Sequence, residues 1–140
     1  MLRDCGFMTG RPKILIVEND TPLAMMMVHV LSCAGCDVMV ANTGKKGMEL
    51  AQENEFNLIA LDMDLPDFNS FEICSDLKQR HLTRNTPIVF VSGKPCMEER
   101  QRGLELGASD YITKPFDPSN FARQILANAK NETNGAIQTQ

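Results

Sequence analysis

The sequence alternates short apolar runs with longer segments of helical periodicity, and it does so five times. The runs are rich in β-branched residues and cover residues 14–17, 37–40, 58–61, 87–91 and 111–113. Such runs predict strands that are buried on both faces. Strands that alternate with helices form a parallel sheet covered on both sides. The chain therefore predicts an α/β fold, with a doubly wound five-stranded parallel sheet and five helices.

Helix signals separate the apolar runs. Asp20 or Thr21 can cap the first helix, and Pro22 stands in its first turn, where a missing N–H does no harm. Gly35 ends this helix, and Gly107 ends the fourth. The remaining predicted helices cover residues 43–54, 70–80, 96–106 and 118–129. Each strand is therefore followed directly by one helix.

Length, charge and cysteine content exclude several classes of protein. The 140 residues suffice for one domain with its own core. A formal net charge of -4 argues against nucleic-acid binding, and no apolar run is long enough to span a membrane. The five cysteines are odd in number and lack a disulfide spacing, so we expect a reducing compartment and a cytoplasmic protein.

The chain divides into three segments. We expect residues 1–12 to be an N-terminal extension without a secretory signal, 13–130 to be the domain, and 131–140 to be a polar, disordered tail. Cys33 and Cys36 match the CxxC form of a redox or zinc half-site, but a second pair is missing. We interpret both cysteines as small buried packing residues.

Acidic, hydroxyl and basic residues stand where the predicted strands end. They are Glu18, Asn19 and Asp20 after the first strand, Asp62 and Asp64 after the third, Ser92 and Gly93 after the fourth, and Lys114 after the fifth. In a doubly wound sheet, ligands bind beyond the carboxyl ends of the strands. Any one of these residues could be a solvated strand end or a helix cap. Together they predict a functional site at one edge of the sheet.

The residue types at this edge favour phosphoryl chemistry. Clustered carboxylates repel each other unless a cation joins them, and Mg²⁺ is the usual cation where phosphate also binds. Asp62 can act as a nucleophile that forms an acyl phosphate, while the metal and Lys114 neutralise the developing charge. A hydroxyl such as that of Ser92 could hold another phosphoryl oxygen.

The chain resembles the receiver domains of two-component response regulators over about residues 13–129. Four pieces carry the resemblance: ILIVEND at 14–20, LDMDLP at 61–66, VSG at 91–93 and GLELGASDYITKPF at 103–116. Each piece alone is weak, but in this order and spacing they are highly specific. The resemblance implies a flavodoxin-like sheet with strand order 2-1-3-4-5.

The resemblance also implies a role for each site residue. Asp62 matches the phosphoacceptor, and Ser92 the family's hydroxyl residue, with the N–H of Gly93 beside it. Lys114 matches the family's lysine, whose bond to the following proline is cis, and Tyr111 the aromatic residue that changes rotamer. For Mg²⁺ the matching ligands are Glu18, Asn19, Asp62 and the backbone carbonyl of Asp64.

Such a domain is implied to be a signalling switch and not an enzyme. Its implied partners are a histidine kinase or phosphotransfer protein, which donates the phosphoryl group, and a downstream protein effector. Its shape is implied to change across the fourth helix, the fifth strand and the fifth helix. We expect a stand-alone receiver, because no effector domain follows in the sequence. We expect it to be monomeric or weakly dimeric, because Asn120 and Gln124 replace charges that often form dimers in DNA-binding regulators.

Two other departures matter for the site. Asn19 stands where an aspartate is usual, so we expect weaker Mg²⁺ binding. An ion pair between Asp64 and Lys94 could shield the acyl phosphate from water. Asn19 also leaves open a pseudo-receiver, a binding module that is not phosphorylated. A haloacid-dehalogenase-type phosphatase is a further alternative, because Asp62 and Asp64 spell its DxD motif.

Overall fold

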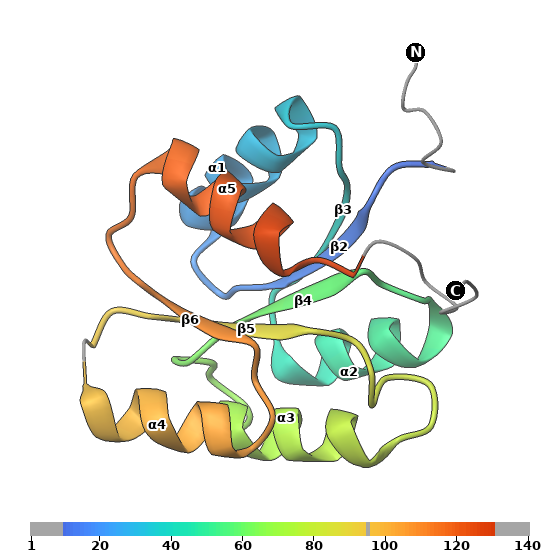
Figure 1. Cartoon of the computed structure of the whole chain (residues 1–140), viewed down its shortest axis with the longest axis vertical. Coiled ribbons are helices and arrows are strands. Elements are labelled where there is room, and N and C mark those ends of the chain that lie inside the picture. The colour runs from blue at the N-terminus through green and yellow to red at the C-terminus, as the bar shows by residue number, and fades with distance from the viewer. Residues whose placement is uncertain (1–9, 95, 131–140) are drawn as a thin grey trace.

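The computed structural model describes residues 10–94 and 96–130 (Figure 1). Five parallel strands form one sheet, in the order β3-β2-β4-β5-β6. They are β2 (Lys13–Val17), β3 (Asp37–Ala41), β4 (Leu58–Asp62), β5 (Ile88–Ser92) and β6 (Asp110–Thr113). Counted along the chain, this is the order 2-1-3-4-5, which confirms the predicted doubly wound, flavodoxin-like sheet. The tail predicted at 131–140 lies outside the described residues, as does most of the 1–12 extension.

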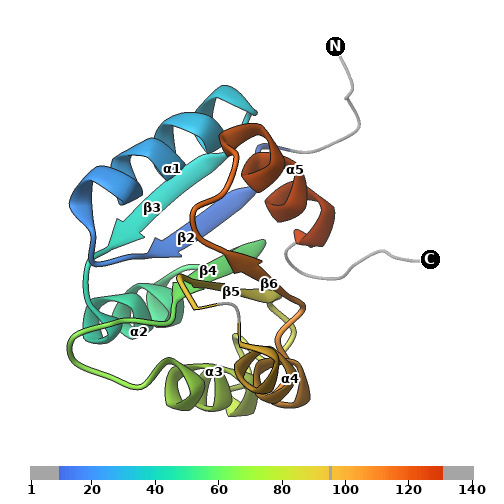
Figure 2. The ribbon, with the colours of Figure 1, turned by 90° about the vertical axis from the view of Figure 1, so that its left-hand side faces the viewer.

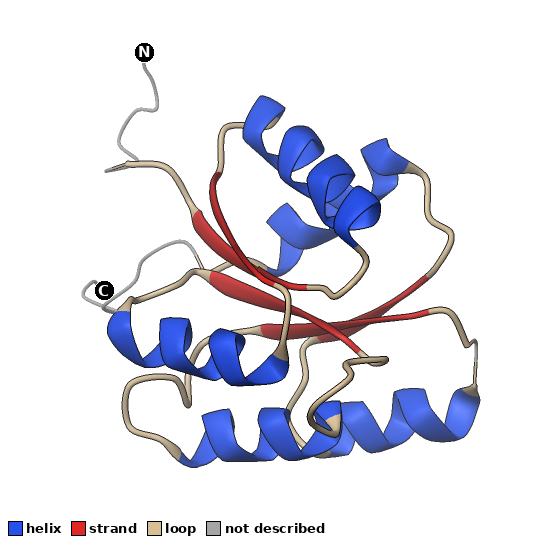
Figure 3. Ribbon diagram, turned by 180° about the vertical axis from the view of Figure 1, so that it is seen from behind, coloured by secondary structure: helices blue, strands red, loops and turns tan. Residues whose placement is uncertain are grey.

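The helices form two layers, one on each face of the sheet. One layer holds α1 (Thr21–Cys33) and α5 (Pro118–Asn128), and the other holds α2 (Gly44–Glu53), α3 (Ser70–Gln79) and α4 (Met97–Glu105) (Figures 1 and 3). Successive side chains of a strand point to opposite faces. Ile14 and Ile16 therefore pack with α1 and α5, whereas Leu15 and Val17 pack with the other layer.

Three strands, β3, β4 and β5, extend one residue further at their carboxyl ends than the sequence predicted. Asp62 pairs with Val91, and Ser92 pairs with Thr113, so both are the last residues of their strands. At its other end β5 begins after Pro87, because proline has no N–H to donate to the ladder. The carboxyl ends of the strands lie at one edge, which faces the viewer in Figure 2. Asp62 and Ser92 are thus held there by rigid backbone.

The ends of α1 confirm one prediction and correct another. Asp20 is the N-cap, and its side chain accepts a hydrogen bond of 3.1 Å from the N–H of Leu23. Cys36 is buried, as predicted, but Cys33 is exposed, so that prediction is wrong for Cys33. Cys33 is the last residue of α1 and faces solvent, with its Sγ 3.8 Å from Nε2 of His29.

The bond between Lys114 and Pro115 is cis, as the family resemblance implies. None of the helices in the described ranges is long and apolar enough to cross a membrane.

Helix α4 approaches the sheet through a glycine. Gly103 is the buried residue of this helix, and a Cβ added there would lie 2.8 Å from two ring atoms of Phe90, in β5. Because Phe90 is fully buried in a closely packed core, its ring cannot move aside freely. The absence of a side chain at Gly103 therefore sets how closely α4 packs.

We predict that Gly103→Ala destabilises the protein by about 1–3 kcal/mol, because the added methyl group overpacks the contact with Phe90. Urea unfolding at equilibrium measures the change. Gln101→Ala, at an exposed position of the same helix, serves as the control and should leave the free energy of unfolding within about 0.5 kcal/mol. Equal stability of the glycine variant and this control would contradict the packing argument.

Candidate functional site

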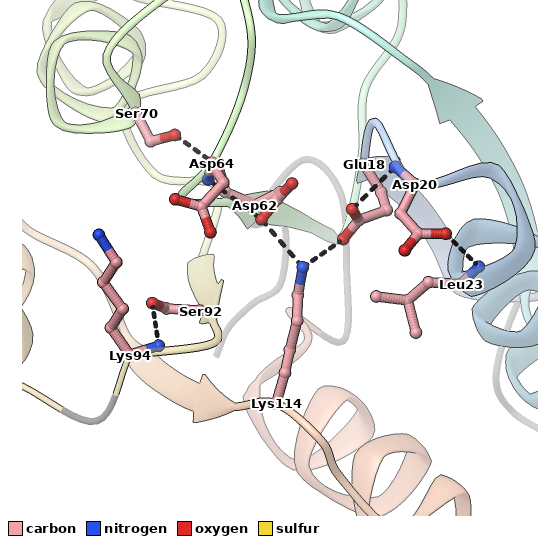
Figure 4. Close-up of polar contacts among 9 residues, drawn as sticks. All are labelled: Glu18, Asp20, Leu23, Asp62, Asp64, Ser70, Ser92, Lys94 and Lys114. Carbon is pink, nitrogen blue, oxygen red and sulfur yellow. Dashed lines mark hydrogen bonds and ion pairs between the residues drawn. The ribbon is translucent and has the colours of Figure 1, made fainter.

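Asp62 lies at the centre of the candidate site, at the end of the central strand β4. Its side chain is almost fully buried, with 2% of the residue exposed. Oδ1 accepts hydrogen bonds from Nζ of Lys114 at 3.1 Å and from the backbone N–H of Asp64 at 3.2 Å (Figure 4). The hydroxyl of Ser70, at the start of α3, donates to the backbone carbonyl of Asp62. The carboxylate is therefore fixed but keeps its second oxygen free of hydrogen bonds within the described residues.

Glu18 follows β2 directly and faces Asp62 across the sheet edge. Its Oε1 forms an ion pair of 3.2 Å with Nζ of Lys114, and its Oε2 accepts from the N–H of Asp20 at 3.1 Å. Only 1% of Glu18 is exposed, and Oε1 makes no hydrogen bond within the described residues. The pKa of Glu18 is raised from 4.5 to about 7, mainly by burial and also by the nearby Asp62, although the N–H of Asp20 and the charge of Lys114 act to lower it.

Lys114 lies between the two carboxylates (Figure 4). Burial alone lowers the pKa of an ammonium group, but Asp62 and Glu18 outweigh this effect, so the pKa of Lys114 is raised above its usual value. The lysine is therefore charged at neutral pH. Two carboxylates and one ammonium group meet at this edge of the sheet.

The side chain of Asn19 makes a hydrogen bond outside the cluster of Glu18, Asp62 and Lys114. Asn19 is exposed, and its Nδ2 donates to the backbone carbonyl of Asn42 at 3.3 Å, in the loop after β3. Among the residues described, no three His, Cys, Asp or Glu side chains are gathered as metal ligands. A cation at this edge would therefore rely on Glu18, Asp62 and main-chain or amide oxygens.

Ser92 lies on the opposite side of Asp62 from Glu18 (Figure 4). It ends β5, is buried, and its Oγ accepts a hydrogen bond of 3.0 Å from the N–H of Lys94. Gly93 is exposed between them. The structure thus brings Ser92 to the same edge as Asp62, as the sequence predicted.

Tyr111 is buried beneath the loop after β5. Its hydroxyl lies 3.1 Å from the backbone carbonyl of Lys94 and 3.1 Å from Oε1 of Glu99, in α4, and it can donate to either. Burial raises the pKa of Tyr111, and Glu99 raises it further, so the phenol is protonated at neutral pH. The sequence gives no signal for the contact between Tyr111 and Glu99, because α4 and β6 meet only through tertiary packing.

Other residues that the sequence singled out make different contacts. No ion pair joins Asp64 to Lys94 in the described part of the chain, so the proposed shielding pair has no support in this conformation. Asn120 accepts a hydrogen bond from Arg123, and Gln124 donates to Asp110. Both therefore bond within the protein.

Comparisons with known proteins identify the family and the fold of the chain. A family model for the response regulator receiver domain matches residues 14–126. Response regulator ArlR of Staphylococcus saprophyticus is 39% identical over 115 residues, which cover 82% of this chain and 51% of that protein. The alkaline phosphatase synthesis transcriptional regulatory protein PhoP of Bacillus subtilis is 35% identical over 115 residues, which cover 82% of this chain and 47% of that protein.

Solved structures show the same fold. Chemotaxis protein CheY4 of Vibrio cholerae matches with a TM-score of 0.81 and 26% identity, over 85% of this chain and 99% of that chain. A CheY-like receiver domain protein of Methanospirillum hungatei matches with a TM-score of 0.79 and 28% identity, over 84% of this chain and 93% of that chain.

The fold and the charged edge thus define a CheY-like, doubly wound α/β domain. The chain belongs to the response regulator receiver family, the signalling switches of two-component systems. It spans about half the length of the curated relatives it matches.

The buried carboxylate of Glu18 predicts a pH-dependent stability. Its pKa is higher in the folded state than in the unfolded chain, so the folded state binds more protons between pH 4.5 and about 7. The contribution of Glu18 to stability therefore falls as pH rises through this window. In metal-free buffer we predict that Glu18→Gln gains stability relative to the wild type by about 1–3 kcal/mol between pH 5 and pH 8.

Urea unfolding of both proteins at the two pH values measures this difference. The control variant Glu53→Gln removes an exposed carboxylate of α2. Its free energy of unfolding should equal that of the wild type at both pH values. If the difference in the free energy of unfolding between the Glu18 variant and the wild type is the same at pH 5 and pH 8, burial does not disfavour the charge on Glu18.

Proposed function

We propose that this receiver is switched by transfer of a phosphoryl group to Asp62. The observation that carries the proposal is the buried carboxylate of Asp62 at the end of β4, 3.1 Å from the ammonium group of Lys114. An oxygen of this carboxylate attacks the phosphorus atom of a phosphohistidine. The bond between phosphorus and nitrogen breaks, the electron pair leaves with the imidazole, and an acyl phosphate remains on Asp62.

The surrounding groups suit the charge of such an acyl phosphate. Lys114 can pair with one phosphoryl oxygen, because its ammonium group already contacts Oδ1 of Asp62. The hydroxyl of Ser92 and the N–H of Gly93, an exposed residue, are donors at the next strand end, and they can hold another oxygen. Ser92 ends β5, and Gly93 and Lys114 directly follow β5 and β6, so these donors are held at the sheet edge before any phosphoryl group arrives and little reorganisation is needed.

The carboxylate and carbonyl oxygens at this edge of the sheet suit Mg²⁺ as a cofactor. Oε1 of Glu18 is buried and makes no hydrogen bond within the described residues, so its ion pair with Lys114 leaves it able to contact a cation as well. Glu18, Asp62 and the backbone carbonyl of Asp64 would hold the ion, and the amide oxygen of Asn19 is the further candidate. When bound, Mg²⁺ neutralises carboxylate and phosphoryl charge.

The switch then involves Ser92 and Tyr111. When the hydroxyl of Ser92 binds a phosphoryl oxygen, its hydrogen bond from the N–H of Lys94 changes in geometry. The carbonyl of Lys94 contacts the hydroxyl of Tyr111. We propose that this chain of contacts couples Asp62 to the surface formed by α4, β6 and α5, where a downstream protein partner binds.

The phosphoryl donor that we propose is a histidine kinase or a phosphotransfer protein. PhoP is named as a transcriptional regulatory protein, and the similar RpaA of Synechocystis as a DNA-binding regulator. We do not assign DNA binding to the domain described here, because the chain carries a net charge of -4 and such binding needs a basic face. Because the chain belongs to the receiver family, we favour this function over that of a haloacid-dehalogenase-type phosphatase.

We predict that acetyl phosphate adds one phosphoryl group to the full chain when Mg²⁺ is present, and that Asp62→Ala abolishes the adduct. Intact-mass spectrometry, with and without Mg²⁺, measures it. The matched control is Asp64→Ala, which removes a neighbouring carboxylate but keeps the backbone carbonyl, so the adduct should persist. A folded wild-type protein that forms no adduct would be a pseudo-receiver.

We also predict that Asn19→Asp strengthens Mg²⁺ binding, on the order of tenfold, because it adds a charged ligand at the sheet edge. Titration of the unphosphorylated protein with MgCl₂, followed by amide NMR shifts, measures the affinity. Asn42→Asp, which adds the same charge in the next loop, is the control. An unchanged affinity in Asn19→Asp would show that residue 19 does not reach the ion.

A further inference from the structure

The loop between β4 and α3, residues 63–69, carries part of the proposed metal site. The backbone N–H of Asp64 donates to Oδ1 of Asp62, and its carbonyl is a proposed ligand. A backbone carbonyl cannot adjust by changing a rotamer. Its position therefore depends on what holds the loop.

Asp67 attaches the middle of this loop to helix α2. Its Oδ1 accepts from the backbone N–H of Gly44 at 2.8 Å, and its Oδ2 accepts from that of Lys45 at 3.0 Å. These N–H groups belong to the first turn of α2, where no helical partner exists. The amide of Lys45, together with that of Gly44, lowers the pKa of Asp67, so the carboxylate is ionised at the positive end of the helix dipole.

Helix α2 already has a cap of its own. The hydroxyl of Thr43 accepts a hydrogen bond of 3.1 Å from the N–H of Lys46. Asp67 therefore does more than cap the helix, because it joins α2 to a loop 23 residues away in sequence. Gly44 makes this approach possible: a Cβ there would lie 3.2 Å from Oδ1 of Asp67 and 2.8 Å from Cδ1 of Ile73.

Met63 and Leu65 pack against the core, and the described hydrogen bonds otherwise hold the loop at its two ends. Met63 donates its N–H to the carbonyl of Val91, and Asn69 caps α3 through the N–H of Phe71. Between them, among the described contacts, only Asp67 hydrogen-bonds to an element other than the strand and helix that flank the loop.

We propose that Asp67 is a positioning residue for the cation site, which acts through α2 to hold the carbonyl of Asp64 in place. This inference rests on the proposed function, since it assumes that Mg²⁺ binds at the sheet edge. Residues that orient metal ligands without touching the metal typically change its affinity by 10–100-fold.

The test compares Asp67→Ala with Thr43→Ala in the full, unphosphorylated chain. Each variant removes one side-chain cap from α2, but only the first frees the loop. We expect Asp67→Ala to weaken Mg²⁺ affinity about tenfold, and Thr43→Ala to stay within about twofold of the wild type. Amide NMR shifts during MgCl₂ titration give the affinities, and thermal unfolding without Mg²⁺ gives the stability of each variant.

Two further variants keep the test informative if Asp67→Ala does not fold. Asp67→Asn keeps one oxygen acceptor and should weaken the affinity less. Gly44→Ala pushes the loop away from the α2 side and should reproduce the effect of Asp67→Ala. The inference is overturned if the Asp67 variants bind Mg²⁺ like the wild type, or if Thr43→Ala weakens binding equally. A wild-type protein that binds no Mg²⁺ refutes the proposed metal site itself, which separates the two failures.

Discussion

The contact of Lys114 with both Glu18 and Asp62 is the interaction on which the carboxyl edge of the sheet depends. Both carboxylates are nearly inaccessible to water, and burying such charges costs several kcal/mol each unless they are paired. The parallel register brings the two carboxylates together. Val17 in β2 pairs with Leu61 in β4, so the residues that follow them, Glu18 and Asp62, must lie side by side. Lys114 follows β6, which lies two strands from β4 in the sheet. Its Nζ forms ion pairs with Asp62 at 3.1 Å and with Glu18 at 3.2 Å.

One lysine does not neutralise two carboxylates. The excess negative charge raises the pKa of Glu18, and the ion pair with Lys114 is the polar contact of its buried Oε1 within the described residues. A fold selected for stability alone could replace this cluster with apolar residues at little cost. The cluster is better understood as a site that is incomplete without a cation, and this is the physical reason to place Mg²⁺ there in the proposed function.

The architecture and the gathering of the site residues could be predicted from the sequence because both follow from local pattern. Five apolar runs separated by helices permit few arrangements, and parallel strands bring Asp62, Ser92 and Lys114 to one edge. The orientation of side chains could not be predicted in this way. Asn19 bonds to the carbonyl of Asn42, and no ion pair forms between Asp64 and Lys94 in the described part of the chain.

The contacts that the sequence did not reveal all join separate elements. Asp67 reaches α2, Ser70 reaches the carbonyl of Asp62, and Glu99 reaches Tyr111. Each requires two elements to meet at a distance fixed by packing, as Gly44 fixes the approach of α2 to the β4–α3 loop. Periodicity predicts the elements but carries no information on these distances.

Helix α4 shows how such contacts bear on a switch. Its buried contact with the sheet is made by Gly103, which contributes no side chain, so little apolar area holds the helix in place. The hydroxyl of Tyr111 adds a polar tie, because it lies equally close to Glu99 in α4 and to the carbonyl of Lys94, two residues beyond Ser92. An element held by few apolar contacts belongs to the least stable part of a fold and moves at low cost. In the proposed switch, Tyr111 is therefore the side chain through which a change at Ser92 reaches the outer surface of α4.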